Sequence, residues 1–101
     1  MWRIKIHQLV VKEDFKSIEP TDKFHILKAI HKKLSLDPQA YGKPLRGEFQ
    51  GYWRLRVQDY RVIYRMIREE VVVVVVKVGI RKDEQVYREL INRLRTLKRS
   101  S

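Results

Sequence analysis

The chain has 101 residues, of which 23 are Lys or Arg and 12 are Asp or Glu, so its formal net charge is +11. This length suits one domain, expected to span residues 1–101, and the charge favours a nucleic acid or an acidic protein as partner. The absence of cysteine excludes disulfides, thiolate metal sites and cysteine nucleophiles.

The N-terminal segment alternates between apolar and polar residues, which predicts a first strand over Trp2–Val10. This segment has no long apolar core and no small-residue cleavage site, so we expect no signal peptide. The longest purely apolar run, Val71–Val76, is too short to span a membrane as a helix. We therefore expect a cytoplasmic location.

Two helical segments are predicted next. Apolar residues at helical spacing indicate a short one over residues 11–18, and a longer amphipathic helix follows the break at Pro20-Thr21. It ends near Leu36, because the residue before Pro38 disfavours the helical region. Residues 39–51 then read as a loop that carries Lys43 and Arg46.

Residues 52–78 predict three successive strands joined by short turns. If Gln58 and Asp59 form a two-residue hairpin loop, Val57 faces Tyr60 and Arg56 faces Arg61. This register places four arginines on one face of the sheet: Arg54, Arg56, Arg61 and Arg65. Opposed arginines repel, so a polyanion lying across the face would explain them better than local stability does. A merely solvated charged face is the alternative.

The run Val71–Val76 predicts a central strand buried on both faces, since β-branched residues are poor helix formers. Lys77 is expected to join the arginine face. The last helix is predicted over Asp83–Leu97, with apolar residues recurring along one side.

Several enzyme classes are excluded by their motifs. The chain has no GxGxxG, no P-loop and no GxSxG elbow, and its three histidines lack metal-binding spacing, so we expect no metal and no cofactor. The remaining candidate for a reactive site is arginine with a tyrosine nearby. Arginine donors can stabilise the charge on a phosphodiester transition state, and RNA supplies its own 2′-hydroxyl as nucleophile. Tyr87 either stacks at such a site or is a core tyrosine at the helix start.

Three strings of the chain match a known family: PLRG at 44–47, YWRLRVQDYRVIY at 52–64 and VGIRKDEQVY at 78–87. They resemble the RelE/ParE toxin superfamily of type II toxin–antitoxin systems, and its RelE-like branch in particular. The resemblance implies an α+β fold with a small antiparallel sheet of about four strands. Two N-terminal helices would pack on one face, with a C-terminal helix, in agreement with the element order above.

The RelE branch cleaves messenger RNA, in its best-known members within the ribosomal A site. The resemblance thus implies a metal-independent mRNA endoribonuclease that inhibits translation through 2′-hydroxyl attack on the adjacent phosphate. By matching position, Arg61 resembles the arginine that holds the scissile phosphate, and Arg81 the one that stabilises the transition state or the leaving oxygen. Tyr87 resembles the tyrosine that orients and stacks at the cleavage site.

Further basic residues are assigned from the same comparison. Arg54 stands where some RelE proteins carry lysines and is assigned to the catalytic set with Arg61, Arg81 and Tyr87. Arg46 matches the basic residue of the loop before the second strand and is assigned to RNA binding. The remaining predicted RNA-binding residues are Lys43, Arg56, Lys77 and Lys82. Arginine is a poor proton acceptor, and no histidine lies near the C-terminus, so the general base is not assigned.

Two other functions stay open from the sequence. ParE-type toxins share the fold and inhibit DNA gyrase, although they do not require Arg61, Arg81 and Tyr87 together. A basic module that coats RNA without cutting it is the second alternative. The family also implies a RelB-like antitoxin as cognate partner, beside mRNA and the 16S rRNA of the ribosomal A site. The charge of +11 fits either kind of polyanion.

Overall fold

The computed structural model describes residues 1–80 and 85–100, with side chains as far as Leu97. The elements follow in the order β1 (Arg3–Ile6), α1 (Gln8–Lys12), η1 (Asp14–Ser17), α2 (Pro20–Ala29), η2 (Ile30–Leu34), α3 (Pro38–Tyr41), β2 (Lys43–Pro44), η3 (Gly47–Phe49), β3 (Trp53–Val57), β4 (Tyr60–Ile67), β5 (Val72–Ile80) and α4 (Gln85–Ser100). Here η1 and η3 are short 3-10 turns, and η2 is a π-helical turn that continues α2.

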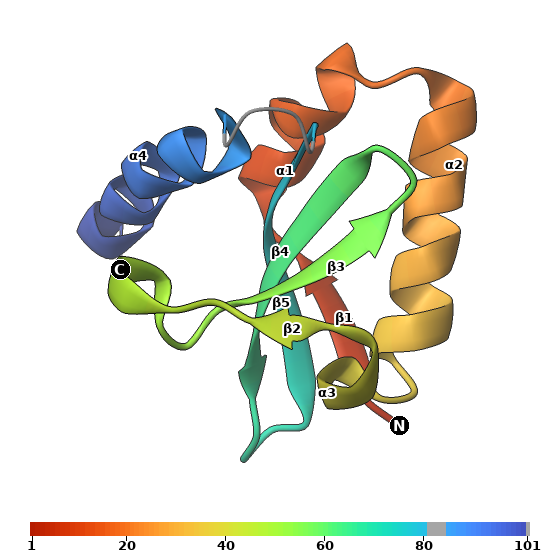
Figure 1. Cartoon of the computed structure of the whole chain (residues 1–101), viewed down its shortest axis with the longest axis vertical. Coiled ribbons are helices and arrows are strands. Elements are labelled where there is room, and N and C mark those ends of the chain that lie inside the picture. Colours follow the sequence, from red (N-terminus) through yellow and green to blue (C-terminus); the bar gives the residue numbers. More distant parts are fainter. Residues whose placement is uncertain (81–84, 101) are drawn as a thin grey trace.

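One five-stranded sheet, in the order β1-β5-β4-β3-β2, runs through the molecule (Figure 1). The α+β class is confirmed, but the sheet is mixed where an antiparallel one was expected, because β1 pairs parallel to β5. The pairing of β1 with β5 begins where the Arg3 amide donates to the carbonyl oxygen of Val71. The additional strand is the two-residue β2, which pairs with β3.

The predicted hairpin between β3 and β4 is confirmed. Val57 pairs with Tyr60, Arg56 with Arg61 and Leu55 with Val62. Gln58 begins the turn with a φ of 52°, the left-handed conformation that two-residue hairpin loops require. The arginines of both strands therefore share one face, as the sequence predicted.

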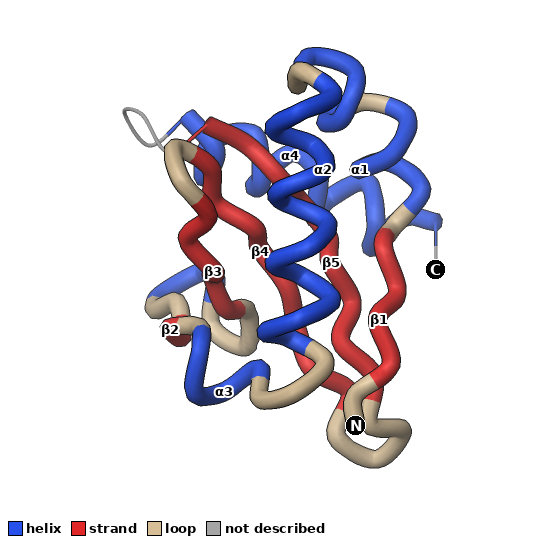
Figure 2. The backbone as a smooth tube through the Cα atoms, turned by 90° about the vertical axis from the view of Figure 1, so that its right-hand side faces the viewer, coloured by secondary structure: helices blue, strands red, loops and turns tan. Residues whose placement is uncertain are grey.

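Helices cover both faces of the sheet (Figure 2). On one face, α1, η1 and α2 bury a cluster with β3, β4 and β5 that includes Val10, Ile26, Leu55 and Tyr64. On the other face, α4 packs Val86 and Leu90 against Ile63 and three valines of β5. The expected two N-terminal helices on one face are thus confirmed, and α4 lies on the face that carries the arginines.

The structure corrects three predicted boundaries. The first strand ends at Ile6 instead of Val10, because the His7 side chain caps α1 by accepting from the Leu9 amide at 3.1 Å. The long helix begins at Pro20, where proline suits the first turn. Residues 39–51, predicted as a loop, contain most of α3 together with β2 and η3. The predicted start of the last helix, Asp83, lies outside the described residues.

Candidate functional site

A row of basic side chains runs across β2, β3 and β4 on the α4 face of the sheet. Arg54 pairs with Ile63, which packs against α4, so Arg54 points to that face. Lys43 of β2 lies opposite Arg54, and Arg61 of β4 lies opposite Arg56. Lys43 and Arg56 are exposed, while Arg54 and Arg61 are half-buried. We call Lys43, Arg54, Arg56 and Arg61 the basic row.

Arg61 differs from an ordinary surface arginine in its surroundings. Its guanidinium carbon lies 5.2 Å from the centroid of the Tyr87 ring, a cation–π distance. Its Nε is buried and, within the described residues, has no hydrogen-bond partner. A buried donor without a partner costs about 1–3 kcal/mol. The Arg61 Nε is therefore an unsatisfied donor beneath the surface, and the Tyr87 ring holds the half-buried guanidinium in place.

Tyr87 belongs to the first turns of α4 and joins this helix to the loop before β3. Its ring centroid lies 5.8 Å from that of Phe49 in η3. Two glycines in the left-handed region, Gly47 at φ 64° and Gly51 at φ 96°, let the chain double back there, so that the Leu45 amide donates to the Tyr52 carbonyl oxygen at 2.8 Å. This loop geometry brings Phe49 against α4.

A pocket of about 370 Å³ opens between η3 and α4. Its lining residues are Leu45, Arg46, Glu48, Phe49, Tyr87, Arg88 and Ile91. Aromatic and aliphatic side chains beside two cations suit a nucleobase attached to a phosphate backbone. The sequence prediction included Arg46 and Tyr87 but missed Glu48 and Phe49, for which only the flanking glycines gave a signal.

The structure brings only part of the predicted site together. Arg61 and Tyr87 are in contact, and Arg54 and Arg56 lie on the same face. Arg81 and Lys82 lie outside the described residues.

Lys77 requires a correction. It lies on the predicted face, opposite Ile63, but it is buried and its ammonium is paired with Asp14 at 3.0 Å and Glu89 at 3.3 Å. Because these carboxylates already neutralise and cover it, we remove Lys77 from the predicted RNA-binding set.

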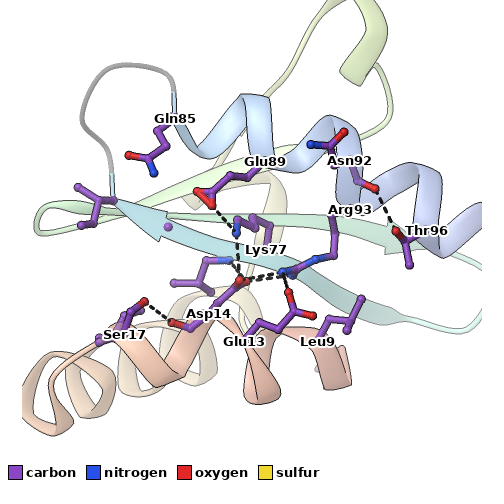
Figure 3. Close-up of a pocket in the computed structure, with 14 residues that line it drawn as sticks. Leu9, Glu13, Asp14, Ser17, Lys77, Gln85, Glu89, Asn92, Arg93 and Thr96 are labelled. Carbon is purple, nitrogen blue, oxygen red and sulfur yellow. Dashed lines mark hydrogen bonds and ion pairs between the residues drawn. The ribbon is translucent and has the colours of Figure 1, made fainter.

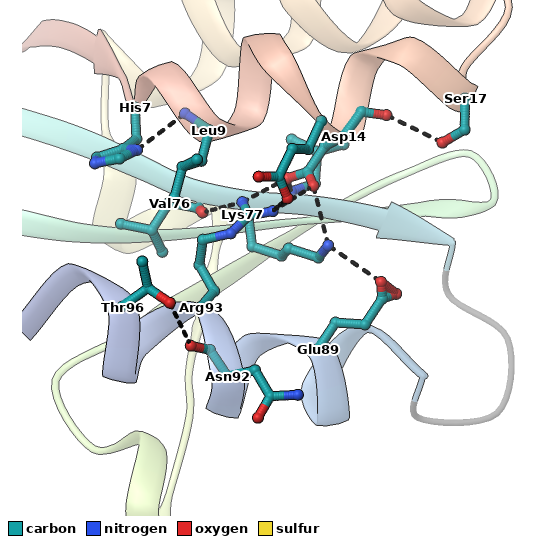
Figure 4. A network of polar contacts seen from close by, with 12 residues as sticks. His7, Leu9, Asp14, Ser17, Val76, Lys77, Glu89, Asn92, Arg93 and Thr96 are labelled. Atoms are coloured by element: carbon teal, nitrogen blue, oxygen red, sulfur yellow. Dashed lines mark hydrogen bonds and ion pairs between the residues drawn. The ribbon is translucent and has the colours of Figure 1, made fainter.

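Lys77 belongs to a buried ion-pair network that sequence reasoning missed (Figure 4). Asp14 of η1 accepts from the Lys77 ammonium, from the Val78 amide and from both terminal nitrogens of Arg93, all within 3.1 Å. Arg93 also donates to the Val76 carbonyl oxygen and to Glu13. The network joins η1, β5 and α4, so it fixes the helix that carries Tyr87.

A second cavity, of about 480 Å³, lies beside this network between η1, the end of β5 and α4 (Figure 3). Glu13, Glu89, Lys77 and Arg93 contribute to its walls, and these groups are paired with one another or with Asp14. The charged groups of this cavity therefore stabilise the fold and already have partners within the protein.

No group of three or more His, Asp or Glu side chains in residues 1–80 and 85–97 is arranged to hold a metal ion. Within the same part of the chain, no helix is long and apolar enough to cross a membrane.

Comparison with known proteins identifies relatives by sequence and by fold. Residues 4–85 match the sequence model of the family described as ParE toxin of type II toxin-antitoxin system, parDE. None of the curated protein sequences matches the chain.

Solved structures of toxins from three organisms are similar to this chain. The toxin–antitoxin complex RelBE2 from Mycobacterium tuberculosis contains a match at 28% identity with a TM-score of 0.75, covering 79% of this chain and 98% of that one. A mutant of the E. coli toxin RelE in the free state matches at 25% identity and TM-score 0.69, over 91% and 96% of the two chains. The RelE–RelB complex from Pyrococcus horikoshii matches at 26% identity and TM-score 0.58, over 80% and 96%.

These matches confirm the resemblance to the RelE/ParE superfamily. The family match spans most of the sequence and includes both strands of the arginine hairpin. The chain is a member of the ParE toxin family, that is, a RelE/ParE superfamily toxin of a type II toxin–antitoxin system.

Proposed function

We propose that this toxin is a RelE-like endoribonuclease that cleaves mRNA in the ribosomal A site and so inhibits translation in the cytoplasm. The observation that carries the proposal is the Arg61 guanidinium against the Tyr87 ring, with a buried Nε that lacks a partner in the described residues. A guanidinium that an aromatic ring holds in place is preorganised to stabilise charge that develops on a phosphate during reaction.

In this mechanism the 2′-oxygen of the RNA attacks the adjacent phosphorus, and the P–O5′ bond breaks to leave a 2′,3′-cyclic phosphate. Arg61 donates to a non-bridging phosphate oxygen, for which the planar guanidinium is well suited. Tyr87 stacks on a neighbouring base. Arg54 and Arg56 lie on the same face as Arg61 and neutralise flanking phosphates.

Arg81 is assigned to the leaving 5′-oxygen by matching position alone. Lys43 and Arg46, both exposed, extend the basic surface toward β2 and η3, and Lys82 is assigned to the RNA by its sequence position. The proton of the attacking hydroxyl has no lysine acceptor on β3, so we assign its removal to Tyr87 or to a group of the ribosome.

We further propose a RelB-like antitoxin as cognate partner. Two of the similar structures described above are complexes of a RelE-type toxin with its antitoxin. An acidic antitoxin segment lying over the basic row would compete with RNA for the same cations.

The second candidate function is inhibition of DNA gyrase, because the matching family is described by the parDE system. Gyrase inhibition requires different properties of the basic row. Gyrase inhibition needs a protein-binding surface, whereas RNA cleavage needs Arg61 and Tyr87 at one phosphate.

Mapping 5′ ends on a translated message tests the proposal. Wild type is compared with Arg61→Ala, Arg81→Ala and the control Arg68→Ala, which changes an exposed residue of the turn before β5. We expect cuts within A-site codons for wild type and for the control, and their loss in both site variants. Absence of cuts by wild-type protein that still inhibits growth and gyrase supercoiling would favour the second candidate.

A further inference from the structure

The pocket between η3 and α4 has the size and the walls of a site for one nucleobase. Its volume is about 370 Å³. Leu45 and Ile91 supply aliphatic surface, and the rings of Phe49 and Tyr87 lie together at its wall, 5.8 Å apart. Single-stranded RNA is recognised through unstacked bases that pack on such surfaces.

The position of the pocket ties it to the basic row. Tyr87 contributes to the pocket and also contacts the Arg61 guanidinium at 5.2 Å. A phosphate bound by Arg61 therefore lies within one nucleotide of the pocket. Arg46 and Arg88, both exposed, contribute from the loop and from α4.

Among the described residues that line the pocket, Glu48 alone is acidic. It is exposed, and within residues 1–80 and 85–97 it forms no ion pair, although Arg46 and Arg88 line the same pocket. A carboxylate so close to a phosphate-binding surface repels the RNA backbone. Such a carboxylate favours RNA binding only if it contacts a part of the nucleotide that donates hydrogen bonds.

Resting on the proposed function, we propose that this pocket holds one base next to the scissile phosphate and that Glu48 reads its Watson–Crick edge. A carboxylate accepts hydrogen bonds but donates none. Guanine offers it two parallel donors, N1–H and the 2-amino group, whereas adenine and cytosine offer one amino group. Uracil turns two carbonyl oxygens toward it and only one N–H. The pocket therefore prefers guanine and disfavours uracil.

The first arm of the test measures binding without cleavage. Guanosine 3′,5′-bisphosphate and uridine 3′,5′-bisphosphate are titrated into the full chain, with NMR detection of the Phe49 and Tyr87 ring signals. We expect about tenfold tighter binding of the guanosine compound by wild type, as one bidentate contact provides. The preference falls to about twofold or less in Glu48→Gln and Glu48→Ala, because neither offers two acceptor oxygens. Glu70→Gln, an exposed acid in the turn before β5, is the control and keeps the preference.

The second arm compares the base composition at cut sites of a translated message for wild type, Glu48→Ala and Glu70→Gln. Loss of the bias against uracil at one position in Glu48→Ala alone supports the inference. Cuts with the same bias in wild type and Glu48→Ala overturn it and leave the nuclease intact. Absence of all cuts, with a Glu48-dependent preference in the binding arm, supports the base pocket and rejects the nuclease. Equal binding of both bisphosphates by wild type overturns the inference.

Discussion

Two groups of cations lie on the same face of the sheet, and their surroundings are opposite. In the network beneath α4, Lys77 and Arg93 are about 93% buried and surrounded by three carboxylates, of which Asp14 is itself 98% buried. In the basic row, Arg61 has a buried nitrogen without a partner and Tyr87, not a carboxylate, lies against it within the described residues. Ile63 of β4 lies between Lys77 and Arg54 and pairs with both.

The difference teaches how to separate structural cations from functional ones in a strongly basic chain. Cations that stabilise the fold are neutralised where they are buried, since an unpaired buried charge is strongly destabilising. Arg61 differs, because no carboxylate pairs with it within the described residues and its Nε is left without a partner there. The net charge of +11 does not distinguish the two kinds, but the location of the carboxylates does.

The largest expected effect concerns the paired group. Asp14→Ala leaves Lys77 and Arg93 buried without their shared carboxylate, and we expect it to lower the unfolding free energy by about 3–5 kcal/mol. Glu13→Ala, which removes a largely exposed partner of Arg93, is the control and costs less than about 1 kcal/mol. Urea unfolding followed by circular dichroism measures both. A cost below about 1 kcal/mol for Asp14→Ala would show that Lys77 and Arg93 do not need this carboxylate to stabilise the fold.

The second prediction concerns Arg61 of the basic row. Arg61→Met removes a donor that lacks a partner but keeps an apolar stem, so we expect the unfolding free energy to stay within about 1 kcal/mol of wild type. RNA cleavage should fall about 10²–10³-fold, as for loss of one preorganised donor. Quantified cuts on a translated message and urea unfolding provide the two readouts. A loss of stability as large as that of Asp14→Ala would make Arg61 a structural residue too.

The third prediction concerns the support beneath the basic row. A Cβ at Gly42 would lie 1.7 Å from the Tyr64 hydroxyl oxygen and 3.0 Å from the Arg54 carbonyl oxygen. Gly42→Ala should therefore displace β2 and cost about 1–3 kcal/mol.

Tyr64→Phe in the same background provides the rescue, because it removes the clashing oxygen. The rescue is partial, because phenylalanine loses the hydrogen bond that the Tyr64 hydroxyl donates to the Pro38 carbonyl oxygen at 2.6 Å, and the Cζ of the ring still lies 2.9 Å from the new Cβ. Thermal unfolding of the four combinations measures the coupling. Additive effects would show that the hydroxyl is not the obstacle.

The smallest expected effect is a pH dependence at the border of the paired group. Burial, then the charges of Arg93 and Lys5, lower the pKa of His7 from its usual value of 6.5. The neutral ring accepts from the Leu9 amide, so its stabilising effect is complete above the unfolded pKa and is lost as the pH falls through about 6.5 toward the folded pKa.

His7→Asn keeps an N-cap acceptor without a titrating group. Between pH 7.5 and 5, we expect wild type to lose up to about 1 kcal/mol more of its unfolding free energy than this variant. Urea unfolding across that range measures the difference. Parallel pH profiles would mean that burial and the neighbouring cations do not disfavour the charged form of His7.

Local patterns in the sequence predicted the hairpin that carries the arginines. Alternation fixed the two faces of β3, and a two-residue turn at Gln58-Asp59 then determined every pair down to Leu55 and Val62. The α+β class followed from the element order and the family resemblance. These features depend on residues close together in the chain.

Features that depend on distant residues could not be predicted. Asp14 and Arg93 are 79 positions apart, and no local pattern marks their contact. Phe49 meets Tyr87 only because two left-handed glycines fold the loop back onto α4. The parallel pairing of β1 with β5 likewise joins residues far apart in the chain, such as Arg3 and Val72, so the sequence pattern of either strand alone does not contain it.

Asp14 also has a role in alignment. Six consecutive valines, Val71–Val76, carry no positional information, because a strand made of one residue pairs equally well after a slip by two. The first residue that breaks this degeneracy is Lys77, and Asp14 holds both its ammonium and the next backbone amide, at Val78. A single carboxylate thus selects one alignment of the central strand from several that hydrophobicity would accept.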